Sequence, residues 1–400
     1  MSEFRGRVPM LLASIICFAV GMGATMFYGI GAFIPSLQSE FGWSRSEISF
    51  GATIMSTASL LFGTVVGQLS DRFGAHRVAA ASYAAYGAAI MIILPLLGGI
   101  GSFWLFSFLV AMMGQGSTPV VLVRPVISAF RTSRGLALGI VATGSGLGAF
   151  WVPRVVSEVT AAAGWRAAYL TIGSLAIATA PIAWIWLRDG VSEDKGDAQV
   201  DSGAGGYTMR QAARLPRFWV MSAISLAMAS AVSGVVIHSV PFLRDDGLDP
   251  ITAASMASLA GLASMIGRVA MGALLDCFDT VAVSIAALTC AVVGVGVLWV
   301  GGAEHAAPAL LLVGFAIGAE TDMIAFMTAR LFGKAHYGVL FGWLFSLFTV
   351  GYGLSPFFIG WVRDSWGTYG PAFAICIALL TLSIGLICSL GPHLRRLQFD

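Results

Sequence analysis

The sequence predicts an all-α membrane protein in which twelve transmembrane helices form two pseudo-symmetric bundles of six. Three observations carry this prediction: the composition, the spacing of the apolar segments and an internal repeat. Of the 400 residues, 58% are apolar and only 10% are charged, whereas charged residues make up about a quarter of a typical soluble domain. This composition excludes a water-soluble enzyme. A net charge of +2 also provides no basic surface for binding nucleic acid.

The apolar segments have the length that a lipid bilayer demands, which is about 20 residues for a helix. They lie at about 9–33, 47–69, 77–98, 102–129, 135–157, 166–187, 217–242, 251–275, 280–301, 306–329, 338–360 and 370–391. The first follows Arg5 and Arg7 as the core of a signal peptide would, but it is longer than the roughly 7–15 residues of such a core. We therefore interpret it as the first span.

The basic residues predict the orientation of the chain. An even number of spans places both termini on one side of the membrane, and cytoplasmic segments are richer in Lys and Arg. With the N-terminus inside, fifteen basic residues fall on inner segments and five on outer ones. We therefore expect a multi-pass protein of a bacterial inner (plasma) membrane, with both termini in the cytoplasm.

One long polar connection divides the chain into two halves. We predict an N-terminal bundle over 1–188, a cytoplasmic loop over 189–216 and a C-terminal bundle over 217–400. The halves share a repeat, since GQLSDRFG at 67–74 matches GALLDCFD at 272–279, about 205 residues later. Each motif follows the second span of its half, so both halves have the same topology.

The loop GQLSDRFGAHR, which begins at Gly67, resembles the signature of the major facilitator superfamily. The resemblance covers nearly the whole chain and implies the major facilitator fold, with transport by alternating access between the two halves. It also implies that Gly67, Asp71, Arg72 and Arg77 form a conformational latch at the cytoplasmic membrane edge. Alternatively, Arg72 and Arg77 only fix the topology by their positive charge.

Four segments resemble the monocarboxylate and oxalate/formate branch of that superfamily. They are SEFGWSRSEIS at 39–49, AFRTSRGLALGIVATGSGLG at 129–148, HSVPFLRDDGL at 238–248 and GAETDMIAFMTARLFGKAHYG at 318–338. That branch places a substrate-binding arginine in a D-x-x-x-R frame, which corresponds here to Arg268, with Ser264 at the aspartate position. A first-span lysine of the animal carriers aligns with Tyr28, which replaces a cation by a phenol.

Charged groups at the depth of a span are candidates for function because burying a charge in lipid is costly. Arg268 can hold a carboxylate through its planar guanidinium, or it can form a structural pair with an acidic residue or with the Asp276 loop. Glu320 and Asp322 lie two residues apart and therefore point about 200° apart around their helix. Either can carry a symported proton, and we expect Glu320 to do so, unless these carboxylates are clamped to an arginine near a cytoplasmic gate.

Three further residues are predicted to bind substrate. His238 lies near the outer end of the seventh span, where it can meet an entering anion, hold an outer gate, or bond to backbone freed by Pro241. Arg124 can supply a second cation or reach the membrane surface along its aliphatic stem. Tyr28 can stack on an aromatic substrate or simply pack.

These features predict a secondary transporter of small organic anions, chiefly monocarboxylates, that moves its substrate with a proton and acts as a monomer. We expect no cofactor, no metal and no catalytic residue, because the chain contains no nucleotide-binding loop and no metal-ligand spacing. One alternative is an importer or exporter of neutral or amphipathic molecules, such as a vitamin-like compound or a drug. Another is a sensor or structural membrane protein that has lost transport.

Overall fold

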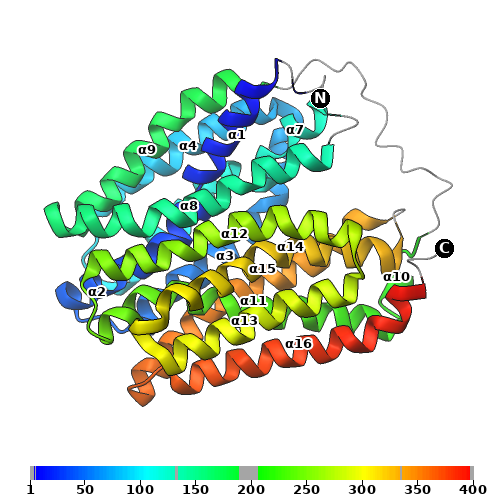
Figure 1. Ribbon diagram of the computed structural model, residues 1–400. Coiled ribbons are helices and arrows are strands. Elements are labelled where there is room, and N and C mark those ends of the chain that lie inside the picture. The colour runs from blue at the N-terminus through cyan, green and yellow to red at the C-terminus, as the bar shows by residue number, and fades with distance from the viewer. Residues whose placement is uncertain (1–3, 5, 131–133, 189–205, 334–335, 397–400) are drawn as a thin grey trace.

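The structure, a computed structural model, is a bundle of long helices and describes residues 4, 6–130, 134–188, 206–333 and 336–396 (Figure 1). The helices are α1 (Val8–Val20), α2 (Tyr28–Phe41), α3 (Arg45–Phe73), α4 (Ala75–Ile93), α5 (Ile100–Gly114), α6 (Pro119–Leu122), α7 (Arg124–Ala129), α8 (Arg134–Ala163), α9 (Trp165–Trp186), α10 (Met209–Ala212), α11 (Pro216–Asp245), α12 (Pro250–Cys277), α13 (Thr280–Gly301), α14 (Ala306–Phe332), α15 (Tyr337–Trp366) and α16 (Gly370–Arg396).

The helices confirm the predicted fold class. Within the described residues, 11 stretches are long and apolar enough to cross a membrane. One of them, Thr280–Phe332, has 53 residues and contains both α13 and α14, so these stretches supply twelve crossings. The only β pairing in the described part of the chain is a single bridge between Gly206 and Gly333.

Several helices extend past the predicted spans because polar residues cap them outside the apolar region. The second span was predicted over 47–69, whereas α3 begins at Arg45 and ends at Phe73. Ser44 accepts a hydrogen bond from the backbone N–H of Glu47, and the Glu47 carboxylate accepts one from the N–H of Ser44. This reciprocal capping box stabilises a helix start that hydropathy alone does not detect.

The first and fourth spans are interrupted near their middles, which the hydropathy of the sequence does not predict. The first is α1, a short π-helical turn over Gly23–Phe27, and α2. The fourth consists of α5, a turn over Gln115–Ser117, α6 and α7. The two breaks are joined, because the N–H of Met22 donates to the Ser117 hydroxyl at 2.9 Å. The break in the first span makes Tyr28 the first residue of α2, in the middle of the bundle.

Each half of the chain is built around its own apolar core. The core of α1 to α9 contains Tyr83, Tyr86 and Phe103, and the core of α11 to α16 contains Phe218 and Phe332. Figure 1 shows α1, α4, α8 and α9 on one side and α11 to α16 on the other. Most of the predicted loop, 189–205, lies outside the described residues, so the predicted domain limits stay a prediction.

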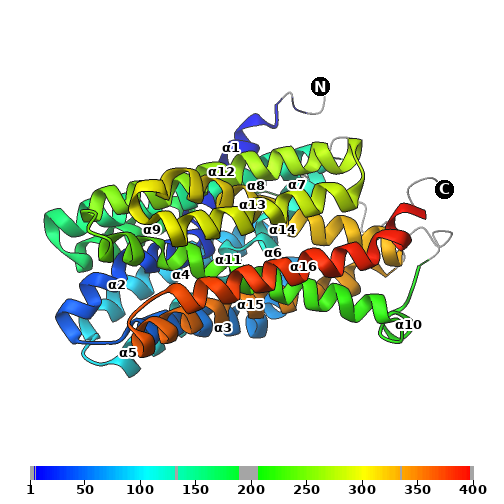
Figure 2. The ribbon, with the colours of Figure 1, turned by 60° about the horizontal axis from the view of Figure 1, so that its bottom comes forward.

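Two helix pairs form the seams between the halves: α3 packs along α15, and α8 packs along α12 (Figure 2). We call the end of the bundle where α1 starts and α16 ends the terminal face, and the opposite end the far face (Figure 1). Toward the far face the seams are tight. A Cβ atom on Gly360 would lie 2.8 Å from the backbone nitrogen of Ser46, and one on Gly261 would collide with the backbone of Ala149 and Phe150.

Toward the terminal face the same seams are open. Gly272 follows Gly261 by eleven residues on α12, and Gly342 precedes Gly353 by eleven on α15. Eleven residues are about three helical turns, so each pair shares one helix face. A Cβ on Gly353 would collide with Ser56, whereas a Cβ on Gly272 or Gly342 would meet no described atom within 4 Å. The halves are therefore closed at the far face and parted at the terminal face.

Candidate functional site

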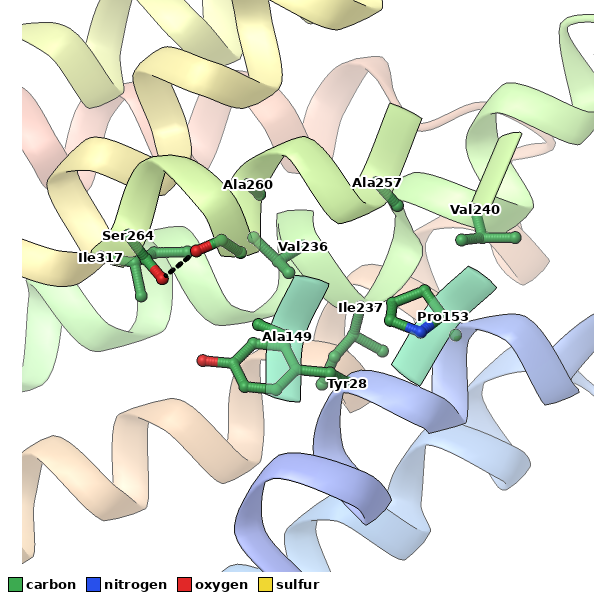
Figure 3. A pocket seen from close by; sticks show the side chains of 12 residues that line it. Tyr28, Ala149, Pro153, Val236, Ile237, Val240, Ala257, Ala260, Ser264 and Ile317 are labelled. Carbon is green, nitrogen blue, oxygen red and sulfur yellow. Dashed lines mark hydrogen bonds between the residues drawn. The ribbon is translucent and has the colours of Figure 1, made fainter. Parts of the chain in front are cut away.

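A narrow pocket lies on the seam between the halves, midway through the bundle (Figure 3). It is lined by Tyr28, Gly31, Ala149, Pro153, Val236, Ile237, Val240, Ala257, Ala260, Gly261, Ser264 and Ile317. Only two of these side chains are polar. The Ser264 hydroxyl donates to the carbonyl oxygen of Gly261 at 2.7 Å, as the dashed line in Figure 3 shows. Tyr28 is therefore the main polar group that the pocket offers.

Arg268 lies one turn along α12 from Ser264, toward the terminal face, and is partly buried. One of its guanidinium nitrogens, Nη1, donates to the Thr321 hydroxyl at 3.3 Å. No ion pair of Arg268 within 4.0 Å is found among the acidic residues whose side chains the structure describes, which do not include Asp276. A guanidinium has five N–H donors, so most of this group's binding capacity remains for an anion. A structural pair with an acidic residue does not occur among these side chains, and the alternative of a pair with the Asp276 loop lies outside them.

Glu320 lies on α14, the helix that packs closely on α12. Only 1% of its surface is exposed, and its Oε1 atom has no hydrogen-bonding partner in the described structure. A buried polar oxygen without a partner is rare enough in native proteins to need an explanation. Both Glu320 and the partly buried Asp322 are within electrostatic range of Arg268. The two carboxyl groups therefore share one cation, although they leave α14 in different directions.

Two tyrosines complete this cluster. The Tyr28 phenol is within hydrogen-bonding reach of Tyr352 on α15, and both phenols are within electrostatic range of Glu320. The structure thus brings together Tyr28, Arg268, Glu320 and Asp322, which were predicted from sequence. Tyr352 was not anticipated, because nothing in the sequence shows that α15 passes beside α2.

His238 lies apart from this cluster, toward the far face, and is fully buried. Its Nε2 atom is 2.8 Å from the carbonyl oxygen of Pro356 and 3.1 Å from the Ser49 hydroxyl. A carbonyl can only accept, so Nε2 carries the proton and donates to Pro356. Its Nδ1 atom is 3.4 Å from the hydroxyl of Tyr369. His238 therefore joins the two halves, since Ser49 belongs to the other half of the chain, and its predicted role at the outer gate or in binding an anion stays a prediction.

A cluster of charges at the far face, beyond His238, also joins the two halves. Arg45 of α3 binds both carboxylate oxygens of Asp245 on α11, at 2.7 and 2.8 Å. Arg363 of α15 donates to Asp245 from its Nε atom at 3.1 Å. The Arg45 side chain is only 12% exposed. We call Arg45, Asp245 and Arg363 the far-face cluster. From sequence, its arginines were counted only as outer charges, because Arg45 and Asp245 are 200 residues apart.

Two neighbours bind to the far-face cluster, and one of them, Asp364, balances its charge. Asp364 accepts the backbone N–H groups of Arg45 and Ser46 at 3.2 and 2.8 Å, which stabilises the start of α3. The Tyr369 hydroxyl lies 2.5 Å from Arg45. Burial raises the pKa of Tyr369 to about 12, so this phenol stays neutral at physiological pH. Two arginines therefore face two aspartates.

Arg124 lies away from the pocket. Its guanidinium pairs with Asp71, the acidic residue of the predicted latch. The geometry thus ties α7 to the end of α3 and gives no support to the predicted contact of Arg124 with substrate. The internal repeat could have indicated a structural role for Arg124, because Arg330 follows Arg124 by 206 residues, close to the repeat offset, and so occupies the equivalent position in the other half. Arg330 donates to the Thr280 hydroxyl at 2.9 Å, at the start of α13.

The remaining latch residues lie at the terminal face. Arg72 lies over the ring of Phe73, with 5.3 Å from its Cζ atom to the ring centroid, and Arg77 is exposed. A Cβ on Gly67 would approach a side-chain methyl of Val120 at 3.6 Å, so α3 passes close to α6 there. The predicted latch role of Gly67, Asp71, Arg72 and Arg77 stays a prediction. No group of three His, Cys, Asp or Glu residues within the described ranges can hold a metal ion.

Comparison with known sequences extends over most of the chain. A family model described as Major Facilitator Superfamily matches residues 13–342. Monocarboxylate transporter 12 of Xenopus laevis is 22% identical over 86% of this chain and 80% of its own length. Monocarboxylate transporter 13 of Bos taurus is 26% identical, over 91% and 84% respectively. An uncharacterized MFS-type transporter of Escherichia coli (strain K12), YhjX, is 21% identical over 84% of each chain.

Solved structures share the fold at low identity. A mutant of the nucleoside transporter NupG superposes with a TM-score of 0.75 and 10% identity, covering 97% of this chain and 99% of its own. A bacterial homolog of the human lysosomal transporter Spinster, in an inward-facing and occupied conformation, gives a TM-score of 0.68 and 15% identity. It covers 100% of this chain and 97% of its own.

Proposed function

We propose that this chain, which belongs to the major facilitator superfamily, carries small monocarboxylate anions together with protons by alternating access. Its family and relatives are membrane transporters and not enzymes. The monocarboxylate transporters among its relatives support the choice of substrate class. In the proposed orientation the terminal face is cytoplasmic, in the inner membrane of a bacterium, so the structure is open to the inside.

The observation that carries the proposal is an available guanidinium within electrostatic range of a buried carboxyl group whose Oε1 atom has no hydrogen-bonding partner in the described structure. Arg268 has donors to spare, and Glu320 is within its electrostatic range with no described hydrogen bond to Oε1. With both acidic residues ionised, the site of one arginine and two carboxylates carries a charge of about −1 and repels an anion. Protonation of Glu320 removes that repulsion. Binding of the proton and of the anion therefore favour each other, which is the requirement for symport.

The experiment for this proposal is uptake into proteoliposomes loaded at known internal pH. The probes are labelled lactate and 4-hydroxybenzoate, with a nucleoside as a neutral comparison and protein-free liposomes as background. We expect both acids to accumulate only when the outside is more acidic than the inside. Failure to move any acid, together with transport of the nucleoside, would overturn the proposal.

Glu320→Gln tests the carrier of the proton. Glutamine keeps the size of the side chain but cannot release a proton, so we expect accumulation driven by a pH gradient to fall at least about tenfold. Exchange of internal for external acid should persist, because a permanently neutral group still permits the anion to bind to Arg268. Glu158→Gln, on the exposed end of α8, is the matched control. Normal accumulation by Glu320→Gln would exclude this role and direct attention to Asp322.

The far-face cluster is the proposed outer gate. Asp245→Asn removes the charge that holds Arg45 and Arg363 together, and we expect the protein to open toward the far face. If the substitution costs the closed gate about 1.4 kcal/mol of stabilisation, the equilibrium between the closed and the open gate shifts tenfold. The measurement uses a variant in which the native cysteines are removed and Val240 is replaced by cysteine. We expect an impermeant reagent added from the far side to label this cysteine faster in Asp245→Asn than in the parent. Asp246→Asn is the control, because the Asp246 carboxylate accepts the backbone N–H of Ala303, in its own half of the chain, at 2.5 Å. Equal labelling in the two variants would argue against the gate.

A second candidate is transport of neutral amphipathic molecules by the same fold. It is favoured by the lining of the pocket, in which Tyr28 and Ser264 are the only polar side chains. This candidate predicts that nucleosides or similar compounds move without a pH gradient. It also predicts that removing the Arg268 charge leaves their transport unchanged.

A further inference from the structure

A ladder of five aromatic rings runs along α15 from the terminal face to the centre of the bundle. Its members are Tyr337, Phe341, Phe345, Phe348 and Tyr352. Successive ring centroids are 5.5, 5.7, 5.8 and 5.9 Å apart, and successive ring planes differ by 8°, 27°, 14° and 26°. The spacing of three or four residues places all five rings on one face of the helix. We call this row the α15 ladder.

The inner end of the α15 ladder meets the candidate site. Tyr352 packs edge-on against Phe27 at a centroid distance of 5.5 Å and is within hydrogen-bonding reach of Tyr28. Both of these partners belong to the other half of the chain. The outer end is near the acidic residues of α14, since Tyr337 is within electrostatic range of Asp322. These contacts place the ladder beside the site and not on the outer surface of the bundle.

Phe348 belongs to the core of its half at 8% exposure, but the rings nearer the terminal face are incompletely buried. Phe345 is 38% exposed, and Tyr337 and Phe341 are partly exposed. The ladder runs beside the face of α15 that carries Gly342, where the seam with α3 has parted. Aromatic faces are therefore available along the open side of the seam, and they lead to Tyr28, Arg268 and Glu320.

Resting on the proposed function, we propose that the physiological substrate is a monocarboxylate with a flat aromatic body. Its ring follows the α15 ladder from the terminal face, and its carboxylate is held by Arg268. The apolar pocket that Tyr28 lines is narrow in this structure, so the ring lies along the α15 ladder and enters the pocket only if the pocket widens (Figure 3). A two- or three-carbon acid would use Arg268 but would leave the ladder and the pocket without contact.

The test compares acids that share a carboxylate and differ in the ring. Counterflow in proteoliposomes is measured for the aromatic acid 4-hydroxybenzoate, for the saturated 4-hydroxycyclohexanecarboxylate and for lactate. Stacking of aromatic groups contributes enough to change affinity by about two- to tenfold for each favourable pair. We expect the aromatic acid to have a KM at least about tenfold lower than that of its saturated analogue.

Variants of the α15 ladder separate a stacking function from a structural one. Phe341→Leu and Phe345→Leu should each raise the KM for the aromatic acid several-fold and change the KM for lactate less than twofold. Phe345→Tyr should restore the wild-type value, because it restores the ring. Trp361→Leu is the control, since Trp361 is 47% exposed on the opposite face of α15.

Two outcomes would overturn the aromatic substrate while leaving monocarboxylate transport intact. One is an equal KM for the aromatic and the saturated acid, and the other is an equal change of the aromatic and the lactate KM in the ladder variants. Absence of transport of all three acids would instead contradict the proposed function itself.

Discussion

Replacing Arg268 with glutamine is expected to abolish monocarboxylate uptake. Removing one partner of a desolvated charge pair costs about 2–5 kcal/mol, which is roughly a 30- to several-thousand-fold loss of affinity. Here the remaining partner would be the substrate carboxylate, facing Glu320 and Asp322, for which the described residues supply no cation in range other than Arg268. The effect should appear in the binding of substrate before any transport step, so equilibrium binding and counterflow should fall together.

Two further variants make this result specific. Arg268→Lys retains the charge but not the planar fork that binds a carboxylate bidentately, so we expect an intermediate loss of about tenfold. Arg154→Gln removes an arginine at the far end of α8, where its Nε atom binds Glu158 at 2.8 Å on the exposed surface, and should be neutral. Uptake of acids by Arg268→Gln at the wild-type KM would contradict the assigned carboxylate site.

The fold could be predicted from sequence because each span is a local pattern. Length, hydropathy and the repeat of GQLSDRFG predicted every long helix, and the structure moves their ends by a few residues. The differences arise where caps such as Ser44 extend a helix beyond the apolar segment. The breaks in the first and fourth spans were missed, because a run of apolar residues with a few glycines has the same hydropathy whether the helix is continuous or not.

Only those residues of the candidate site that carry a charge within an apolar span could be predicted from the sequence. Arg268 and Glu320 are conspicuous in an apolar chain, since burying a charge in lipid is costly. Arg124 satisfied the same criterion, yet it lies at the end of the fourth span and pairs with Asp71. The far-face cluster could not be predicted, because Asp245 meets Arg45 only when the two halves close against each other.

A valine at Gly261 is expected to prevent closure of the far face. A Cβ at this position would collide with the backbone of Ala149 and Phe150 on α8, and backbone atoms of a packed helix cannot rotate aside as a side chain can. The halves must separate along the seam between α8 and α12. We therefore expect a protein that folds and is held open to the far face, with net transport abolished and labelling of a cysteine at Val240 from that side near its maximum.

Gly272→Val provides the matched control, because Gly272 is about three turns further along the same face of α12 and its Cβ would meet no described atom within 4 Å. Valine disfavours a helix equally at both positions, so any difference between the variants reports on the seam. If alternating access brings the terminal ends of α8 and α12 together in the other state, Gly272→Val should retain the far-face closure seen here and protect the Val240 cysteine. Identical labelling of the two variants would show that the seam does not move, and would leave the rocking of the two halves without support.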